Sequence, residues 1–222
     1  MSDAESLIAI GDVHGCARSL EALLEKLASY SDRKFVFIGD YIDRGPDSRS
    51  VVELLLEFRK NHDTIFLRGN HEQLLLDSIE ENDYQLWLMN GGDTTLNSYD
   101  ADYPNPAIPA AHMQFYRDTR LYYETDDYFF VHAGIPADQT VKEAKNREEA
   151  AYHFLWDRSH LNALETVWEK TVVFGHTPRS QPIVKDHMLG IDTGCVFKSL
   201  GYGKLTAALL PEEEFLKQIC LD

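Results

Sequence analysis

The chain has 222 residues, of which 21 are lysine or arginine and 37 are aspartate or glutamate, so its formal net charge at pH 7 is −16. Such an acidic chain argues against binding along a nucleic-acid backbone or to an anionic membrane surface, because both need a basic face. An anionic substrate would need a local positive site, which bound cations can provide.

The composition also predicts a cytoplasmic protein without a membrane partner. Cys16, Cys195 and Cys220 are too few and too widely spaced for a disulfide framework, so we expect reduced thiols, with Cys195 a buried and unreactive one. Residues 1–5 are acidic where a signal peptide would be basic, and no apolar run approaches the roughly 20 residues of a membrane span. The length suits one large α/β domain.

The first expected element is a buried strand over residues 7–10, which ends in Gly-Asp-Val-His-Gly at residues 11–15. Asp12 and His14 alternate with Val13, so in an extended segment both side chains point to the same side. An oxygen and a nitrogen ligand side by side suit a divalent transition metal. A turn with a capping aspartate and a surface histidine is the alternative.

An amphipathic helix is expected over residues 17–27, and a second buried strand over residues 35–38. That strand runs into Gly-Asp-Tyr-Ile-Asp-Arg-Gly at residues 39–45, where Asp40 is a metal-ligand candidate. Asp43 is a supporting acid, and Arg44 offers a planar fork that matches phosphate oxygens. An ordinary turn with a solvated pair of aspartates is the alternative.

The next helix is expected over residues 46–58, with Asp47 or Ser48 as its N-cap. A third buried strand over residues 64–67 then leads into Arg-Gly-Asn-His-Glu at residues 68–72. Asn70 can offer an amide oxygen to a metal. His71 follows it directly and therefore points elsewhere, free to serve as a proton donor.

These three motifs, in this order and at this separation, resemble those of the phosphoprotein phosphatase family of calcineurin-like metallophosphoesterases. Its relatives include bacterial and phage protein phosphatases and symmetrical diadenosine tetraphosphate hydrolases. The resemblance implies an α/β fold in which a central β-sandwich is flanked by α-helices. It also implies a site for two metals at the carboxyl ends of the strands, within a single domain over residues 1–222.

The segment over residues 74–120 is less informative. We interpret it either as helices packed over one face of a sheet or as a helical cap beside the active site that sets substrate choice. Pro104, Pro106 and Pro109 mark an irregular connection within it. A β-hairpin follows, with strands over residues 121–124 and 128–131.

The remaining strands repeat the pattern of an apolar run followed by a ligand-type side chain and glycine. His132 follows the hairpin, and His176 follows a buried strand over residues 171–174. Residues 141–156 are expected to be helical. Residues 189–194 and 204–209 resemble the closing strands of the fold. Both histidines match metal-binding positions of the family, and Arg158 matches a second phosphate-clamping arginine that follows a tryptophan.

The resemblance assigns roles to ten residues. Asp40 would bridge two divalent cations, with manganese our first expectation and iron or zinc open. Asp43 and His71 would act as a catalytic pair, and Arg44 and Arg158 would bind the substrate. The full set of expected metal ligands is Asp12, His14, Asp40, Asn70, His132 and His176.

We therefore expect a hydrolase in which hydroxide that bridges the two cations attacks phosphorus in line and His71 protonates the leaving oxygen. Asp12, His14 and Asp40 would hold one cation, and the other four contacts would come from Asp40, Asn70 and the two later histidines. The main prediction is a serine/threonine, or dual-specificity, phosphoprotein phosphatase. The alternatives are a dinucleoside polyphosphate hydrolase on the same site and a binding module without activity.

Overall fold

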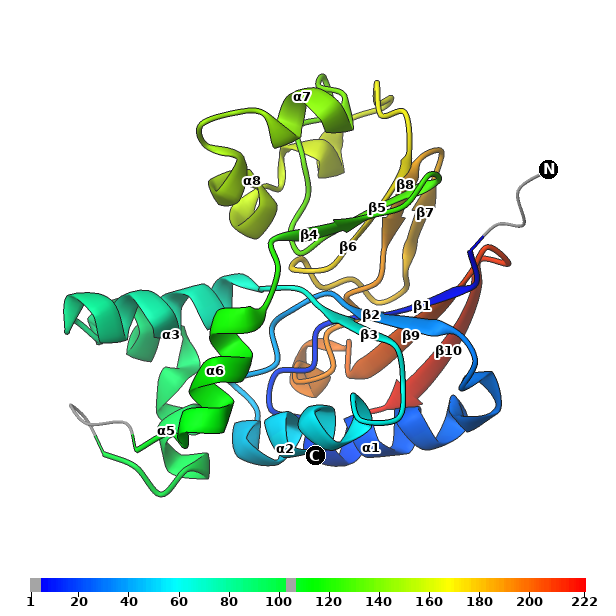
Figure 1. Cartoon of the computed structure of the whole chain (residues 1–222). Helices are drawn as coiled ribbons and strands as arrows, with labels where there is room; N and C mark the ends of the chain where they lie inside the picture. The colour runs from blue at the N-terminus through cyan, green and yellow to red at the C-terminus, as the bar shows by residue number, and fades with distance from the viewer. Residues whose placement is uncertain (1–4, 103–106) are drawn as a thin grey trace.

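The computed structural model describes residues 5–102 and 107–222, and it shows two stacked β-sheets with helices on both outer sides (Figure 1). The expected α/β sandwich is therefore confirmed. Among the described residues, no helix is long and apolar enough to cross a membrane.

The first sheet has the strand order β10-β9-β1-β2-β3. Strands β1, β2 and β3 are parallel to one another. Strand β9 runs antiparallel to β1, and β10 runs antiparallel to β9. Its strands are β1 (Leu7–Ile10), β2 (Lys34–Phe37), β3 (Thr64–Phe66), β9 (Lys204–Leu210) and β10 (Glu214–Ile219).

The second sheet has the strand order β4-β5-β6-β8-β7. Here β5, β6 and β8 are parallel, and the outer strands β4 and β7 run antiparallel to their neighbours. Its strands are β4 (Tyr122–Glu124), β5 (Tyr128–Val131), β6 (Thr171–Phe174), β7 (Ile183–Lys185) and β8 (Met188–Gly190).

Each central strand is buried on both faces, which explains its continuous apolar sequence. In β1, Leu7 and Ala9 pack between the two sheets, whereas Ile8 and Ile10 point to the helices on the outer side. In β5, Phe130 enters the layer between the sheets and Phe129 packs under the outer helices of the second sheet. This alternation fixes the register of both sheets.

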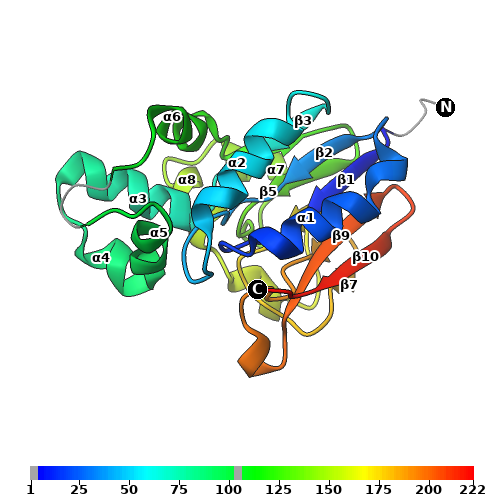
Figure 2. The same cartoon turned by 90° about the horizontal axis from the view of Figure 1, so that it is seen from below.

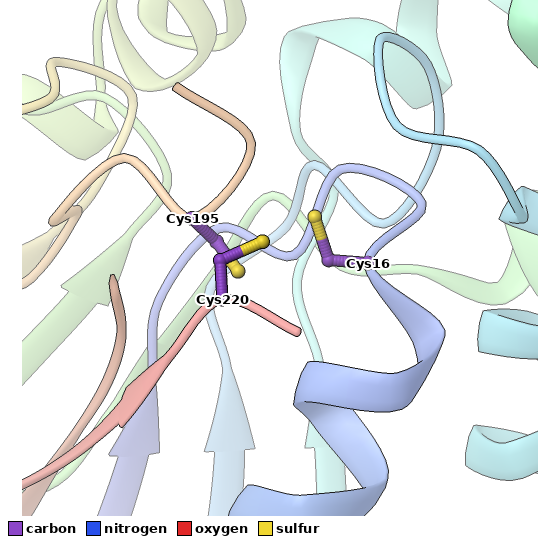
Figure 3. A group of neighbouring side chains, drawn as sticks. All are labelled: Cys16, Cys195 and Cys220. Atoms are coloured by element: carbon purple, nitrogen blue, oxygen red, sulfur yellow. The ribbon is translucent and has the colours of Figure 1, made fainter. Parts of the chain in front are cut away.

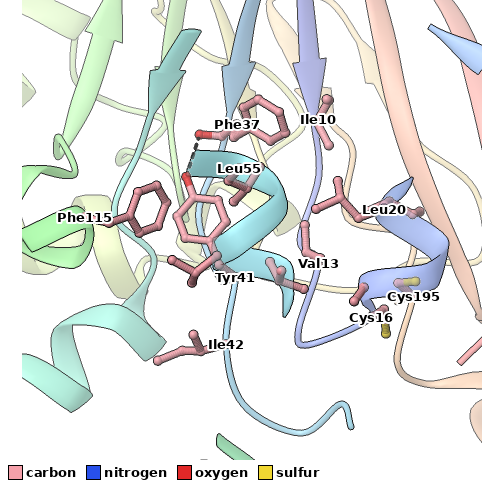
Figure 4. Close-up of a cluster of buried hydrophobic side chains, with 14 of the residues drawn as sticks. Ile10, Val13, Cys16, Leu20, Phe37, Tyr41, Ile42, Leu55, Phe115 and Cys195 are labelled. Atoms are coloured by element: carbon pink, nitrogen blue, oxygen red, sulfur yellow. Dashed lines mark hydrogen bonds between the residues drawn. The ribbon is translucent and has the colours of Figure 1, made fainter. Parts of the chain in front are cut away.

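Two helices cover the outer face of the first sheet, and two more cover the second sheet (Figures 1 and 2). The first pair is α1 (Ala17–Lys26) and α2 (Ser48–Phe58), where Asp47 accepts a hydrogen bond from the Ser50 N–H as N-cap. The second pair is α7 (Val141–Lys145) and α8 (Ala150–Trp156). Figure 4 shows part of the buried cluster under α1 and α2.

A group of helices projects to one side of the sandwich (Figure 2). It comprises α3 (Asn70–Glu81), α4 (Gln85–Trp87), the π-helical turn η2 (Leu88–Gly92), α5 (Asp93–Ser98) and α6 (Ala110–Asp118). Its apolar residues join the same cluster as those of α1 and α2. Short 3-10 turns also lie between these elements: η1 (Ala28–Tyr30), η3 (Ser159–Asn162) and η4 (Lys198–Leu200).

The structure corrects one expected element and adds two strands that were not expected. Residues 141–156 form two helices, because α7 is a closed unit in which Thr140 and Glu143 cap each other and Asn146 ends it. The strands β7 and β10 were not expected: β7 is an edge strand of only three residues, and half of the residues of the edge strand β10 are charged or polar. Of the three prolines, Pro109 precedes α6, whereas Pro104 and Pro106 lie outside the described residues.

Candidate metal centre and active site

The structure brings the expected metal ligands together at the carboxyl ends of strands from both sheets, with the Asp40 carboxylate in the middle. Asp40 Oδ2 lies 3.4 Å from His14 Nε2 and 3.4 Å from His132 Nε2. Ligand atoms of Asp40, His132 and His176 all lie within 4.8 Å of one another. The first sheet thus contributes the carboxylate and His14, and the second contributes the other two histidines.

Asn70 and Asp12 complete this cluster. Asn70 Oδ1 lies 3.0 Å from His132 Nε2 and 2.9 Å from His176 Nδ1. Asp12 Oδ2 accepts a hydrogen bond of 2.9 Å from the backbone N–H of His176. All six side chains are buried, with at most 7 % of their surface exposed.

The imidazoles are held with their lone pairs turned toward the carboxylate. His14 Nδ1 lies 2.9 Å from the Ile42 carbonyl oxygen and His132 Nδ1 lies 2.8 Å from the Ile38 carbonyl oxygen, so each of these nitrogens carries the hydrogen. Burial lowers the pKa of His14 to about 3 and lowers the pKa of His132, which keeps both rings neutral. Their Nε2 atoms therefore face Asp40 as acceptors.

This donor set fits divalent cations. Acceptor atoms that face one another repel unless a proton or a metal ion lies between them. Asp12 Oδ1 and His176 Nε2 are buried and have no hydrogen-bond partner among the described residues. Burial raises the pKa of Asp12, and repulsion from Asp192 and Asp40 raises it further, so Asp12 needs a nearby cation to hold it in its charged form. Mixed carboxylate, amide and imidazole donors suit manganese, iron or zinc.

The loops that carry the ligands have an unusual backbone. Among the described residues other than glycine, nine have a left-handed φ, and five of them are site residues: His14, Asp40, Asp43, Arg44 and His176. The extended geometry expected for residues 12–14 is therefore wrong, because His14 has a φ of 46°. Both side chains still reach the cluster, through a tight turn. Left-handed residues at this density are typical of functional sites.

One glycine shows how closely these loops approach. Gly39 has a φ of 103°, and a Cβ atom there would lie 2.5 Å from the Gly69 backbone nitrogen. Only glycine allows the loop that carries Asp40 to lie against the loop that carries Asn70.

His71 and Asp43 form a buried pair beside the cluster. His71 Nδ1 lies 2.7 Å from Asp43 Oδ2, and both side chains are fully buried. Burial works against the charged imidazolium, but the charge of Asp40 and the hydrogen bond with Asp43 outweigh it, so the pKa of His71 is raised. His71 Nε2 has no partner among the described residues. The ring lies 4.8 Å from that of His14, centroid to centroid.

The two expected substrate-binding arginines lie on different sides of the cluster. Arg44 is exposed, and its Nη1 donates to His14 Nε2 over 2.9 Å. Arg158 is also exposed, and its Nε donates to Thr177 Oγ1 over 3.2 Å, next to His176. Two guanidinium groups thus border the cluster on two sides, where their planar forks could bind the oxygens of a phosphate group.

Comparison with known proteins gives the same family assignment as the three sequence motifs. The family model described as "Calcineurin-like phosphoesterase" matches residues 6–196. This chain belongs to the calcineurin-like phosphoesterase family. It is accordingly a metal-dependent phosphoesterase, a hydrolase, and the resemblance seen in the three motifs is confirmed.

Within this family, the chain is 32 % identical to a bis(5'-nucleosyl)-tetraphosphatase PrpE [asymmetrical] of Oceanobacillus iheyensis, over 93 % of this chain and 89 % of the relative. It is 30 % identical to a protein of the same name from Anoxybacillus flavithermus, over 92 % and 90 %. A solved structure of a cold-active protein-tyrosine phosphatase from a Shewanella species shares the fold, with a TM-score of 0.70 and 18 % identity over 98 % of this chain and 78 % of that one.

Four further buried residues of this phosphoesterase support the cluster, and the sequence analysis gave none of them a role. Glu72 accepts the backbone N–H groups of Asp40, Tyr41 and Gly69, and burial raises its pKa to about 7. Asp192 faces Asp12 and Asp40, and burial raises its pKa to about 7 as well. Asp192 lies just after the apolar strand β8 and between Gly190 and Gly194, so a pattern close to that of Asp12 and Asp40 also marks it.

Trp87 and Thr95 are the other two supporting residues, and both donate hydrogen bonds to the Asp43 carboxylate. Trp87 Nε1 donates to Asp43 Oδ2 over 2.9 Å, and Thr95 Oγ1 donates to Asp43 Oδ1 over 2.6 Å. Both belong to the helical group over residues 70–118, which therefore contacts the site as well as the core. No local sequence signal marks either residue, because each acts through a contact more than 40 positions away.

Proposed function

We propose that this phosphoesterase hydrolyses bis(5'-nucleosyl) tetraphosphates asymmetrically, so that each turnover releases one nucleoside triphosphate and one nucleoside monophosphate. The observation that supports it is 32 % and 30 % identity, over more than nine-tenths of the chain, to two proteins with that named activity. The prediction of a serine/threonine phosphatase becomes the second candidate. The dinucleotide hydrolase, the alternative in the sequence analysis, becomes the first.

The proposed ligands divide between two cations that share Asp40. Asp12 and His14 would complete one coordination sphere, and Asn70, His132 and His176 the other. Two divalent cations there supply Lewis acidity, which activates water near neutral pH and offsets charge on phosphate oxygens. Manganese remains the ion we expect, with iron and zinc compatible with the same donors.

The residues around the cluster would then bind and protonate the substrate. Arg44 and Arg158 would contact phosphate oxygens from two sides, which a polyanion needs on a chain of net charge −16. His71 would donate the proton on Nε2 to the leaving phosphate oxygen. Asp43 holds the other nitrogen of the ring, which fixes its orientation and favours the charged, donating form.

Two half-buried aromatic rings flank the cluster at its two ends and would contact the nucleosides. The Phe197 ring lies 6.3 Å from the His14 ring, and the Arg44 guanidinium lies 5.4 Å from the Phe197 centroid. The Trp156 ring lies 6.0 Å from the His176 ring. A tetraphosphate over the cations would direct its bases outward, where flat rings can stack on them.

A protein phosphatase would use the same cations and the same His71, and the Shewanella enzyme shows that this fold accommodates one. That candidate is ranked second because it rests on likeness of fold alone. It needs neither aromatic ring, since a phosphorylated side chain carries no base. A binding module without activity is the weakest candidate, because every donor atom for the chemistry is assembled.

The test compares substrates with one preparation loaded with Mn²⁺. Diadenosine tetraphosphate, a phosphoserine peptide, a phosphotyrosine peptide and p-nitrophenyl phosphate are supplied separately, and the products are separated by ion-exchange chromatography. We expect ATP and AMP in equal amounts from the dinucleotide, with a kcat/KM at least about tenfold above that for either peptide, a difference of 1.4 kcal/mol.

Two ADP molecules per turnover would contradict asymmetric cleavage, and faster hydrolysis of a phosphopeptide would favour the second candidate. Asp47→Asn, in the same loop as Asp40 but at the start of α2, is the control for loss of activity through disturbed folding.

A further inference from the structure

All three cysteines of the chain meet in one buried cluster, although they lie at positions 16, 195 and 220. Their sulfur atoms lie within 4.8 Å of one another, and their exposed fractions are 0 %, 1 % and 8 % in that order. Figure 3 shows the three side chains, which come from the start of α1, the loop after β8 and the end of β10. We call this group the thiol cluster.

Apolar packing alone does not account for the thiol cluster. All three residues do belong to the core under α1 and α2, and Figure 4 shows Cys16 and Cys195 near Val13 and Leu20. Packing, however, only requires small apolar side chains. It gives no reason for every cysteine of the chain to converge from three distant segments. Convergence of sulfur atoms is what a thiophilic metal ion requires.

Oxygen donors border the same cluster. Cys220 Sγ donates to the Asp222 backbone oxygen over 3.9 Å. The Asp222 side chain lies next to the fully buried Ser19, whose hydroxyl donates to it over 2.5 Å. Asp222 and Ser19 thus place oxygen atoms beside Cys220, where one of them would serve as a fourth ligand to an ion held by three sulfurs.

We propose that Cys16, Cys195 and Cys220 form a binding site for one thiophilic cation, such as Zn²⁺ or Cu⁺, that is separate from the phosphoesterase centre. Zinc–sulfur bonds are about 2.3 Å long, so two sulfurs on one ion lie at most about 4.6 Å apart and the observed cluster needs only small shifts. Each thiol that binds releases its proton to solvent. The two centres differ in chemistry, because the phosphoesterase ligands are oxygen and nitrogen atoms and these are sulfur.

An ion in this site would connect segments that carry the catalytic ligands. Cys16 follows the loop of Asp12 and His14, and its thiol donates to the His14 carbonyl oxygen over 3.5 Å. Cys195 lies three residues after Asp192. Cys220 directly follows the edge strand β10. The ion would therefore tie both active-site loops to the last strand, and it would stabilise the fold by mass action because the unfolded chain has no preformed site.

The test uses Cd²⁺ on the reduced, metal-free protein, because cadmium–thiolate bonds give a charge-transfer absorption that oxygen and nitrogen ligands do not. We expect the band to saturate at one ion per chain. In Cys220→Ser we expect it to fall by at least a third at saturation, with affinity at least about tenfold weaker, the effect of 1.4 kcal/mol. The control is Asp40→Asn, which alters the phosphoesterase centre and leaves all three thiols, so its band should be unchanged.

A second measurement needs no mutation. One equivalent of Zn²⁺ beyond that which fills the phosphoesterase centre should slow alkylation of Cys220, the most exposed of the three, at least about tenfold by mass spectrometry.

Absence of the cadmium band, an equal band in Cys220→Ser, or alkylation that zinc does not slow would overturn the proposal. So would a metal-free protein with two of its three thiols already joined as a disulfide. None of these readouts involves phosphate release, so they are independent of the proposed activity.

Discussion

The metal-ligand loops and the helical group over residues 70–118 serve one active site in different ways. Each ligand loop follows a buried strand, so the position of Asp40 or His132 is set by the strand before it and by a tight turn. The helical group acts at a distance, since Trp87 and Thr95 reach back to Asp43 on another loop. The proposed metal ligands are therefore held by local geometry, whereas His71, the proposed proton donor, is held through tertiary contacts of its partner Asp43.

The largest effect should come from substituting Asp40, the residue that both proposed cations would share. Asp40→Asn removes the charge that faces His14 and His132, so we expect one or both metals to be lost and activity to fall at least about 10³-fold, since each metal supplies several kcal/mol. Elemental analysis and turnover measure the two outcomes, with Asp47→Asn as the matched control. Two metals per chain in Asp40→Asn would contradict the bridging role.

The next effect separates proton donation from metal binding. His71→Asn should leave the metal content unchanged and lower kcat at least about 10²-fold on diadenosine tetraphosphate, the usual loss when a general acid is removed. The loss should shrink on p-nitrophenyl phosphate, whose leaving group needs less protonation. His112→Asn, at another buried histidine of the helical group, is the control. Equal losses on both substrates would argue against His71 as the acid.

A smaller effect should come from the helical group itself. Trp87→Phe keeps most of the buried ring but removes the N–H that donates to Asp43. We expect an approximately tenfold lower kcat on the dinucleotide with unchanged metal content, as for other groups that orient a catalytic residue. Trp168→Phe loses a comparable hydrogen bond, to the Pro136 carbonyl oxygen, far from this pair. If both variants kept full activity, the comparison between the two regions would fail.

The most selective effect concerns the two flanking rings. Phe197→Leu and Trp156→Leu should each lower kcat/KM for diadenosine tetraphosphate about tenfold, because one stacked base is worth about 1–3 kcal/mol. Hydrolysis of p-nitrophenyl phosphate should stay within about twofold. Tyr152→Leu, an exposed ring on the same helix as Trp156, is the control. Equal losses on both substrates would mean that the rings support the metal centre and do not bind bases.

The sequence predicted the parts of this molecule that follow local rules. The buried strands over residues 7–10, 35–38 and 64–67 and the motifs after them led directly to Asp12, His14, Asp40 and Asn70. The edge strand β10 escaped notice because it is half exposed and carries Glu214, Lys217 and Gln218 among its apolar residues.

What the sequence did not predict depends on contacts between distant segments. In the sequence, Trp87 has the pattern of an ordinary core residue. Only the folded structure brings its indole N–H to the Asp43 carboxylate. The thiol cluster was likewise invisible, because cysteines at positions 16, 195 and 220 meet only once β10 lies beside β9. The described helices of residues 74–120 pack into the core, as one of the two interpretations predicted, and Trp87 also contacts Asp43. A cap that sets substrate choice, the other interpretation, stays a prediction.

The strand order of the first sheet has a consequence for biosynthesis. The strand made first, β1, pairs with β2 on one side and with the late strand β9 on the other, and the Gly11 N–H, just before Asp12, donates to the Thr206 carbonyl oxygen. A nascent chain still missing residues 204–210 has no partner for that edge of β1. The loop that carries Asp12 should therefore reach its final position only after these residues leave the ribosome, so that shortened translation products lack phosphoesterase activity.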